Sequence, residues 1–301
     1  MLAFTLHAGS AQAQPARVFV AAQGLDTNPC TFAQPCRSFQ KAHDTVVAGG
    51  EIDVLDPAGY GALTITKAIS IQGHSFSGII ATSGDAIHID AAATDVINLR
   101  GLIIEGAGTG VTGISFSSGA LLNVQESVIS RFGSNGVAFV PGGASKLLVS
   151  NTVVSDNGGR GILVGSGGAG PVTAMLNRSE LSNNLGSGLG VSGLSGTGVM
   201  NVTVADSVMA NNTIDGVDSF SSNGHAAVNI MLVRCVVFSN GSVGVLTSGP
   251  PVTLRSFQTA VTANATGWSK QNNSTFLTYG DNGVDGNTTE VLGAPTSLTT
   301  R

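Results

Sequence analysis

The chain has 301 residues, of which 13 are basic and 18 acidic, and its net charge is −5. With 42% hydrophobic residues it can bury a substantial core, whereas the absence of a basic run argues against nucleic acid as a partner. No apolar run reaches the roughly 18 residues of a membrane-spanning helix, so we expect no membrane span.

Residues 1–14 (MLAFTLHAGSAQAQ) resemble the end of a secretory signal, because Ala11-Gln12-Ala13 has the A-x-A form of a cleavage site. The basic n-region is missing and the apolar stretch is short, which indicates a truncated or misassigned start. A signal here predicts a secreted or periplasmic protein. The alternative interpretation is a disordered N-terminus.

Residues 15–48 are predicted to form an N-terminal cap. A strand is expected at 17–22. Cys30 and Cys36 follow in the proline-bounded loop NPCTFAQPC, where we expect a disulfide in an exported protein. Ser38 is a suitable N-cap for a helix through Val47. One apolar face of this helix would cover the end of the core, and it carries Phe39, Ala42, His43, Val46 and Val47.

Short strands are expected from residue 49 onward, at 51–55, 63–66, 69–72, 79–81, 86–89 and 95–99. His74, Asp85, His88 and Asp90 lie in this region, but their spacing matches no metal-ligand pattern. We therefore expect no metal and no cofactor.

A repeat of 25–28 residues occupies residues 101–245. Its copies begin at Gly101, Ser127, Thr152, Ser179, Ser207 and Cys235. The tenth position is always glycine, at Gly110, Gly136, Gly161, Gly188, Gly216 and Gly244. The sixth position is asparagine in four copies, Asn157, Asn184, Asn212 and Asn240. The third and eleventh positions are aliphatic, beginning with Ile103 and Val111.

Each copy has strand–turn–strand signals, is too short for a crossover helix and shows no helical spacing. The sequence therefore predicts an all-β protein, a single-stranded right-handed parallel β-helix of about nine coils. Glycine and asparagine would supply left-handed backbone at the bends, and stacked asparagines would form a buried ladder. Cys235, at an inward position, is expected to be a buried thiol.

Two columns of the repeat are expected to face outward. The residue before each copy places opposite charges on neighbouring coils, as Arg100, Glu126, Asn151, Arg178, Asp206 and Arg234. The second position forms an apolar stripe of Leu102, Val128, Val153, Val208 and Val236, interrupted by Glu180. Further strands are expected at 252–257, 259–262 and 274–279. The β-helix is predicted over 49–292, and 293–301 would be a loose tail.

The candidate ligand site is a polar corner. Arg131, Asp156 and Arg160 should lie on adjacent coils, so that the two arginines bind an anion or a uronate and Asp156 orients them. The alternative is a solvated ion-pair ladder. Asp206, Asp215 and Asp218 share one coil, but they are expected on different faces and form a poor calcium site.

The whole chain resembles exported bacterial proteins of the right-handed parallel β-helix, pectin-lyase-like class. The resemblance lies in NPCTFAQPCRSF and GGEIDVLDPAGYGALTITKAISIQG near the start, LRGLIIEGAGTGVTGISF and the Asn/Gly repeats in the middle, and YGDN…GN near the end. It implies the fold, but relatives with this fold include lyases, hydrolases, epimerases, adhesins and phage spikes.

Three functions remain open at this point. Because no catalytic motif is evident, we expect an exported structural protein or one that binds a polysaccharide or cell-surface glycan. The second hypothesis is a carbohydrate-active enzyme, a polysaccharide lyase or glycoside hydrolase. The third is an oligomeric adhesin or spike, assembled through the apolar stripe.

Overall fold

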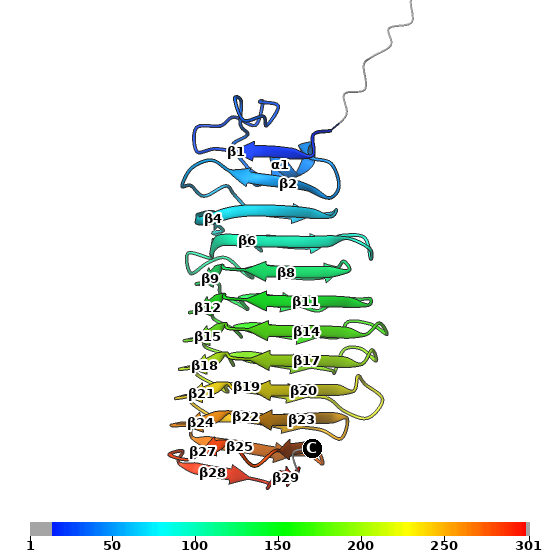
Figure 1. The fold of residues 1–301 in the computed structure, drawn as a ribbon, viewed down its shortest axis with the longest axis vertical. Coiled ribbons are helices and arrows are strands. Elements are labelled where there is room, and N and C mark those ends of the chain that lie inside the picture. The colour runs from blue at the N-terminus through cyan, green and yellow to red at the C-terminus, as the bar shows by residue number, and fades with distance from the viewer. Residues whose placement is uncertain (1–13, 299–301) are drawn as a thin grey trace, which may run out of the picture.

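The computed structural model describes residues 14–298 as one parallel β-solenoid of about nine turns with a single short helix. Figure 1 shows the coils stacked from the N-terminal end to the C-terminal end. The all-β fold class and the parallel β-helix are therefore confirmed. The predicted signal segment falls almost entirely on residues 1–13, which lie outside the described residues.

Two sheets run along the solenoid, and all their strands pair in parallel. The first contains β1 (Arg17–Val20), β2 (Gly50–Val54), β4 (Ile69–Ile80), β6 (Val96–Glu105), β8 (Leu121–Gln125), β11 (Ser145–Ser150), β14 (Val172–Asn177), β17 (Met200–Ala205), β20 (Val228–Val233), β23 (Val252–Phe257), β26 (Thr275–Thr278) and β29 (Thr296–Ser297). It continues into the short strands β9 (Val128–Ser130), β12 (Val153–Ser155), β15 (Glu180–Ser182), β18 (Val208–Ala210), β21 (Val236–Phe238), β24 (Ala260–Thr262) and β27 (Gly283–Val284). We call it sheet A.

The second sheet, sheet B, closes the other side of the coils. Its strands are β3 (Leu63–Ile65), β5 (Ile87–Asp90), β7 (Ile114–Ser118), β10 (Val137–Phe139), β13 (Ile162–Gly165), β16 (Leu189–Ser192), β19 (Val217–Phe220), β22 (Val243–Ser248), β25 (Thr266–Gln271) and β28 (Thr289–Leu292). Inward side chains of both sheets form one continuous buried core. This explains why aliphatic residues alternate with polar ones along each strand.

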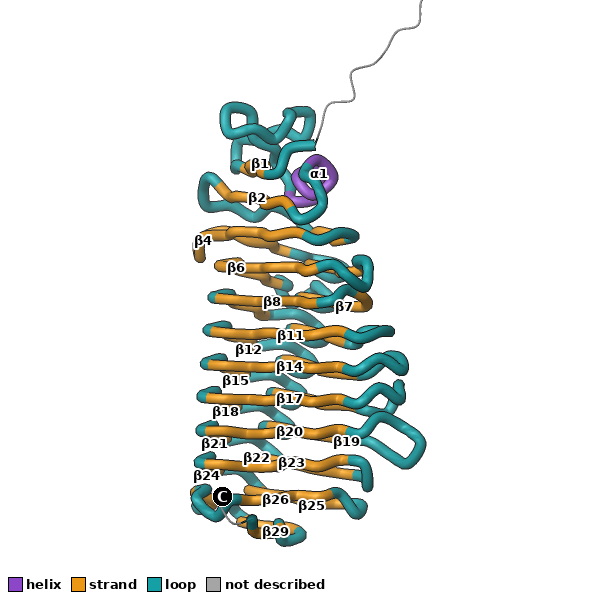
Figure 2. Tube along the Cα trace, turned by 45° about the vertical axis from the view of Figure 1, so that its right-hand side comes forward, coloured by secondary structure: helices purple, strands orange, loops and turns teal. Residues whose placement is uncertain are grey.

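The N-terminal end is covered by α1 (Phe39–Thr45), which Figure 2 shows beside β1 and β2. Ser38 caps it, its hydroxyl accepting a hydrogen bond from the Lys41 amide at 3.2 Å. Phe39, Ala42 and His43 are buried against the core as predicted, but the helix ends at Thr45, two residues before Val47. Val46 is extended and buried.

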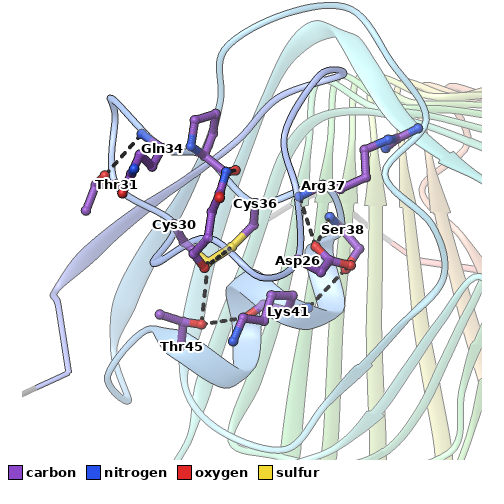
Figure 3. Close-up of a disulfide and its surroundings, with 11 residues drawn as sticks. Asp26, Cys30, Thr31, Gln34, Cys36, Arg37, Ser38, Lys41 and Thr45 are labelled. Atoms are coloured by element: carbon purple, nitrogen blue, oxygen red, sulfur yellow. Dashed lines mark hydrogen bonds between the residues drawn. A yellow bond between two sulfur atoms is a disulfide. The ribbon is translucent and has the colours of Figure 1, made fainter.

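The predicted disulfide joins Cys30 and Cys36, and Figure 3 shows it beside α1. Asp26 anchors the same loop by accepting hydrogen bonds from the Arg37 and Ser38 amides and from the Ser38 hydroxyl. Partial burial opposes its ionisation, but the Ser38 hydrogen bonds and the Arg37 charge outweigh that effect and lower the pKa of Asp26.

Two buried ladders hold the coils in register. The predicted asparagine ladder is present: each amide donates to the next asparagine Oδ1 at 2.9–3.0 Å from Asn157 to Asn287. A second ladder was not predicted from the sequence: a backbone amide of one coil donates to the Ser127, Thr152, Ser179 or Ser207 hydroxyl of the next coil. Cys235 stands in this column with a buried thiol, as predicted.

The glycine file is confirmed from Gly136 to Gly244, because the residues that follow these glycines pair along sheet B. The expected reason for these glycines, a left-handed backbone at the bends, is wrong. These glycines do not have positive φ; left-handed backbone occurs instead at non-glycine corners such as Glu126 (φ 51°) and Arg131 (φ 59°). A Cβ on Gly188 would lie 2.9 Å from both Asn212 Nδ2 and the Gly216 carbonyl oxygen, so close packing of coils requires glycine here.

The first copy of the repeat has a different register from the predicted one. Strand pairing matches Ile104, not Ile103, with Ile129, and matches Ile114 with Val137. Gly113 therefore occupies the place assigned to Gly110. Ile103 and Val111 are exposed rather than inward, and Leu102 is buried rather than outward.

The C-terminal end differs from the predicted loose tail. Thr296–Ser297 form β29, which pairs with Leu277 and Thr278 of β26. Glu290 ends the asparagine ladder, because its carboxylate accepts from the Asn287 amide at 3.2 Å and from Asn287 Nδ2 at 2.7 Å.

Candidate functional site

The three residues of the predicted ligand corner, Arg131, Asp156 and Arg160, each contact a different partner. Arg131 forms an ion pair with Glu105, and Asp156 accepts a hydrogen bond from the Ser155 hydroxyl at 2.7 Å. Arg160 points to Asp218, 58 residues away in sequence, with Nη2 at 3.1 Å from Oδ2. Among the described residues, no hydrogen bond or ion pair joins any two of Arg131, Asp156 and Arg160. In this part of the chain, Asp156 thus makes no contact that orients either arginine, and the ligand-binding role of the three residues stays a prediction.

Arg160 belongs to a different cluster, on the outer face of sheet B. Its side chain crosses the intervening coil over Gly190, where an added Cβ would lie 2.2 Å from Arg160 Nε. The Ser187 hydroxyl donates to the same Asp218 oxygen at 2.6 Å. The sequence does contain a signal for this crossing, because Gly190 interrupts a column that holds Leu163 and Ala138 on the preceding coils.

Two buried carboxyl groups lie in this cluster. Burial raises the pKa of Asp218, although Arg160 and Ser187 oppose the shift. Burial also raises the pKa of Asp215, and the nearby Asp218 charge raises it further. Hydrogen bonds from the Val243 amide and the Ser242 hydroxyl, and the Arg160 charge, act in the opposite direction. Their polar partners are supplied from within the chain, so we assign this cluster a structural role.

Metal ligands do not gather in the described part of the chain, where no group of three His, Cys, Asp or Glu side chains is placed to hold an ion. Asp206 is exposed at a corner of sheet A, whereas Asp215 and Asp218 are buried. Asp206 therefore lies apart from the other two, but Asp215 and Asp218 lie in one cluster, where the Asp218 charge acts on Asp215, instead of on different faces as expected.

The outward charge column forms a better candidate site. The members from Glu126 to Arg234 lie at left-handed corners between a long and a short strand of sheet A, whereas in the first copy Gly101 takes the left-handed position and Arg100 lies just before it within β6, opposite Gln125. We call this row the corner groove; it comprises Arg100, Glu126, Asn151, Arg178, Asp206 and Arg234. Shallow depressions occur along it, one lined by Gln72, His74, Ser75, Arg100, Gly101 and Glu126, and another by Asn151, Val153, Arg178, Glu180, Asp206 and Val208.

Charges in the corner groove are mostly paired between coils. Arg100 binds Glu126 through two nitrogens at 3.0 and 2.9 Å, and Arg234 binds Asp206 at 2.7 and 2.8 Å. The Arg234 hydrogen bond is the main cause that lowers the pKa of Asp206, despite partial desolvation, and the Arg178 charge adds to it. The predicted pairing of opposite charges along this column is thus confirmed for these two pairs.

Arg178 differs from the other two arginines of the groove. Its Nε donates to Asn151 Oδ1 at 3.0 Å, and no carboxylate of the described residues lies within ion-pair distance. Glu180 is beside it, but its Oε1 accepts from the Ser182 hydroxyl at 2.6 Å. The terminal nitrogens of Arg178 therefore remain available to an outside acceptor.

A second polar group lies at the N-terminal end of the groove. His74 Nε2 is 2.6 Å from Asp53 Oδ1, and Arg17 Nη2 holds Asp53 Oδ2 at 2.8 Å. The imidazole is 46% exposed and stacks on Phe76 with ring centroids 5.7 Å apart. If the Nε2 proton faces the carboxylate, Nδ1 keeps a free lone pair at the surface.

The fold matches known proteins over most of its length. A pectate lyase, Pel9A, superposes with a TM-score of 0.52 at 16% identity, covering 94% of this chain and 77% of the lyase. The ORF18 protein of Geobacillus virus E2 has a TM-score of 0.56 at 10% identity, covering 89% of this chain and 59% of the viral one. The A-module of the Azotobacter vinelandii mannuronan C-5 epimerase AlgE4 reaches a TM-score of 0.45 at 14% identity, covering 84% of this chain and 91% of the module.

No curated protein matches the chain in sequence. In the part of the chain that the structure describes, no helix is both long and apolar enough to cross a membrane. The family model described as the right handed beta helix region matches residues 85–259, which is more than half of the chain. Together with the solenoid described above, this match shows that the chain belongs to the right-handed β-helix family.

Proposed function

We propose that this protein is exported and binds an acidic polysaccharide or cell-surface glycan along the corner groove, without catalysing a reaction. The observation that carries the proposal is Arg178, an exposed guanidinium in the middle of a row of polar side chains, with its terminal nitrogens free. A guanidinium donates two parallel hydrogen bonds to a carboxylate, which is the geometry a uronate presents.

The regular spacing of the coils supports the same proposal. Neighbouring coils are ~4.8 Å apart, so the groove offers a hydrogen-bonding side chain at each step along the solenoid axis. An extended glycan lying along this axis would meet these groups one after another. The disulfide between Cys30 and Cys36 supports export, since such bonds persist in oxidising compartments.

Binding can be measured by calorimetry with a polyuronate and with a neutral polysaccharide of similar length. We expect the wild type to bind the polyuronate and Arg178→Gln to lose about 10- to 100-fold in affinity, since a charge-assisted hydrogen-bonded contact contributes about 1.5–3 kcal/mol. Lys41→Gln is the matched control, because it removes the same charge from α1. Equal binding by Arg178→Gln would refute the site, and no binding by the wild type would refute the function.

The corner of Arg131, Asp156 and Arg160 stays a predicted ligand site. Arg131 is 60% exposed, but its guanidinium already has Glu105 as a partner, so we expect Arg131→Gln to have a smaller effect than Arg178→Gln. The same calorimetric experiment ranks the two sites. A larger loss for Arg131→Gln would move the site to the predicted corner.

A carbohydrate-active enzyme is the second candidate, favoured by the pair of His74 and Asp53. The carboxylate can fix the tautomer of the imidazole and leave Nδ1 as a general base at the end of the groove. One protein with the same fold is a pectate lyase. Absorbance of unsaturated products and release of reducing ends test this candidate; activity that His74→Gln abolishes would replace the binding proposal.

A further inference from the structure

The chain contains five asparagines that are each followed by glycine: Asn135, Asn157, Asn223, Asn240 and Asn282. Such a pair is chemically labile, because the amide nitrogen of the glycine can attack the side-chain carbonyl carbon of the asparagine. Glycine favours this attack, since it has no side chain to hinder it and its backbone turns freely. A pair that is hydrogen-bonded and packed within a coil must first open locally, which lowers its rate of reaction. The surroundings of each pair therefore decide which one reacts.

Three of the pairs are fixed at the bends between coils. Asn157 and Asn240 belong to the buried ladder, in which their side-chain amides donate at 2.9 Å to the next asparagine. The amides of the glycines that follow them donate to backbone carbonyls at 2.7 and 2.9 Å. Asn135 Oδ1 accepts from the Arg160 amide at 2.9 Å, and the amide of the glycine after Asn135 donates to the Arg160 carbonyl at 3.0 Å. In all three pairs the attacking nitrogen is already hydrogen-bonded.

The fourth pair is fixed near the C-terminal end of the solenoid. Asn282 Nδ2 donates to the Ser256 carbonyl at 3.0 Å and to the Thr278 hydroxyl at 2.8 Å. Its Oδ1 accepts from the Thr259 amide at 2.8 Å, and the Gly283 amide donates to the Thr259 carbonyl at 3.0 Å. Turning the side chain and the glycine nitrogen toward each other would break these hydrogen bonds.

The fifth pair has none of these restraints. Asn223 and Gly224 are exposed at the tip of the loop 221–227, which Figure 2 shows projecting from the stack between β19 and β20. In the described chain, no hydrogen bond involves the Asn223 side chain or the Gly224 amide. Gly224 has a φ of 84°, and an added Cβ there would meet nothing within 4 Å. The attacking nitrogen and the carbonyl carbon are therefore both free to move and open to water.

We propose that Asn223 is a modification site, the position at which the folded protein deamidates by reaction with water and without an enzyme. The Gly224 nitrogen gives up its proton to solvent base and forms a bond to Asn223 Cγ. The bond from Cγ to Nδ2 breaks, and Nδ2 takes a proton from water and leaves as ammonia. The cyclic imide then adds one water molecule. Opening at Cγ gives aspartate, whereas opening at the Asn223 main-chain carbonyl gives isoaspartate, whose main chain runs through Cγ.

The base of the loop can hold either product without disturbing the coil. Ser221 Oγ donates to the Ala226 carbonyl at 2.6 Å, and the Ala226 amide donates to the Gly196 carbonyl at 2.9 Å. Ser221 and Ala226 are buried, so the extra methylene of an isoaspartate main chain is confined to the exposed turn between them. The inference does not rest on glycan binding, since the loop enters β20 at Val228, whereas Arg234 of the corner groove follows the other end of this strand.

Peptide mapping by mass spectrometry tests the proposal on the full chain, incubated at mildly alkaline pH and sampled over time. Each deamidated peptide gains the mass difference between an amide and an acid, and chromatography separates its aspartate and isoaspartate forms. We expect Asn223 to react at least about tenfold faster than any of the other four asparagines, which corresponds to an activation free energy lower by about 1.4 kcal/mol. These four pairs are matched controls within the same molecule.

Two further comparisons separate the effect of the fold from that of the local sequence. In urea that unfolds the protein, the five rates should converge, because the restraints on the other four pairs are gone. Asn223→Gln should abolish the acidic species that ion exchange separates from the incubated wild type, since glutamine has to close a larger ring. The proposal would be overturned if Asn223 reacted no faster than another pair in the folded protein, if its advantage persisted unchanged in urea, or if the acidic species still formed in Asn223→Gln.

Discussion

Replacing Asn212 by alanine is the strongest single test of the ladder that holds the coils together. Asn212 Nδ2 donates to Asn240 Oδ1 at 2.9 Å and to the Leu181 carbonyl at 3.0 Å. Its Oδ1 accepts from the Asn184 amide at 3.1 Å and from Asn184 Nδ2 at 2.9 Å. The side chain is buried, so alanine removes four hydrogen bonds where water cannot replace them.

The expected loss is large because one group is left without a partner. Each bond contributes about 1 kcal/mol net, and the Asn184 amide, a buried donor, then costs about 1–3 kcal/mol as an orphan. We therefore expect Asn212→Ala to lower the free energy of unfolding by about 5–7 kcal/mol. Thr213→Ala, at the exposed neighbouring residue, should change it by less than about 0.5 kcal/mol.

Urea denaturation followed by circular dichroism measures the global effect, with the free energy taken by linear extrapolation. Amide hydrogen exchange should show the local one, as faster exchange at Asn184. Asn212→Asp is a second test of the ladder. Its carboxylate can still accept both hydrogen bonds from Asn184 but cannot donate any. Because its charge is buried, this variant should be at least as unstable as Asn212→Ala at neutral pH. Equal stability of Asn212→Ala and Thr213→Ala would refute the reasoning.

Three further predictions concern single sites. Gly188→Ala should destabilise the protein by about 1–3 kcal/mol through overpacking, whereas Gly142→Ala, whose Cβ would meet nothing within 4 Å, should be neutral; equal melting temperatures would contradict this. Burial raises the pKa of Asp215 in the folded state. The protein therefore loses stability as the pH rises from the pKa of Asp215 in the unfolded chain, about 4, through its higher pKa in the folded protein. Asp215→Asn should therefore be more stable than wild type at neutral pH, with the gain disappearing in acid; a constant gain would exclude ionisation as its cause. Glu290→Ala should speed hydrogen exchange of the last coil, and Glu290→Gln, which keeps one acceptor, should do so less.

The fold was predictable because each coil must satisfy the same stacking rules. The aliphatic third position and the asparagine at the sixth recur wherever strands pair in register, and these columns were correct from Ser127 onward. The copy at Gly101 departs from the predicted register because its turn between Gly106 and Gly113 is longer than in the later copies, so the glycine spacing does not place its strand residues correctly. A repeat period alone does not reveal such a local insertion.

The site was less predictable, because side-chain reach is not a property of the repeat. The prediction placed Arg131 and Arg160 together on the assumption that polar residues near one bend share a partner. Arg160 instead reaches Asp218 across the gap left by Gly190, and Arg131 turns to Glu105. The outward charge column was recognised, but which arginine lacks a carboxylate depends on distances that spacing cannot give.

Glu290 gives the solenoid a defined length. The side-chain amide of each asparagine in the ladder donates to an acceptor on the next coil. Without such an acceptor, the amide of the last asparagine would lack a hydrogen-bond partner. One carboxylate on the final coil meets it by folding back on Asn287. A shortened protein that ends one coil earlier would thus need an equivalent carboxylate three residues after Asn264, and grafting one there is a rational route to β-helices of chosen height.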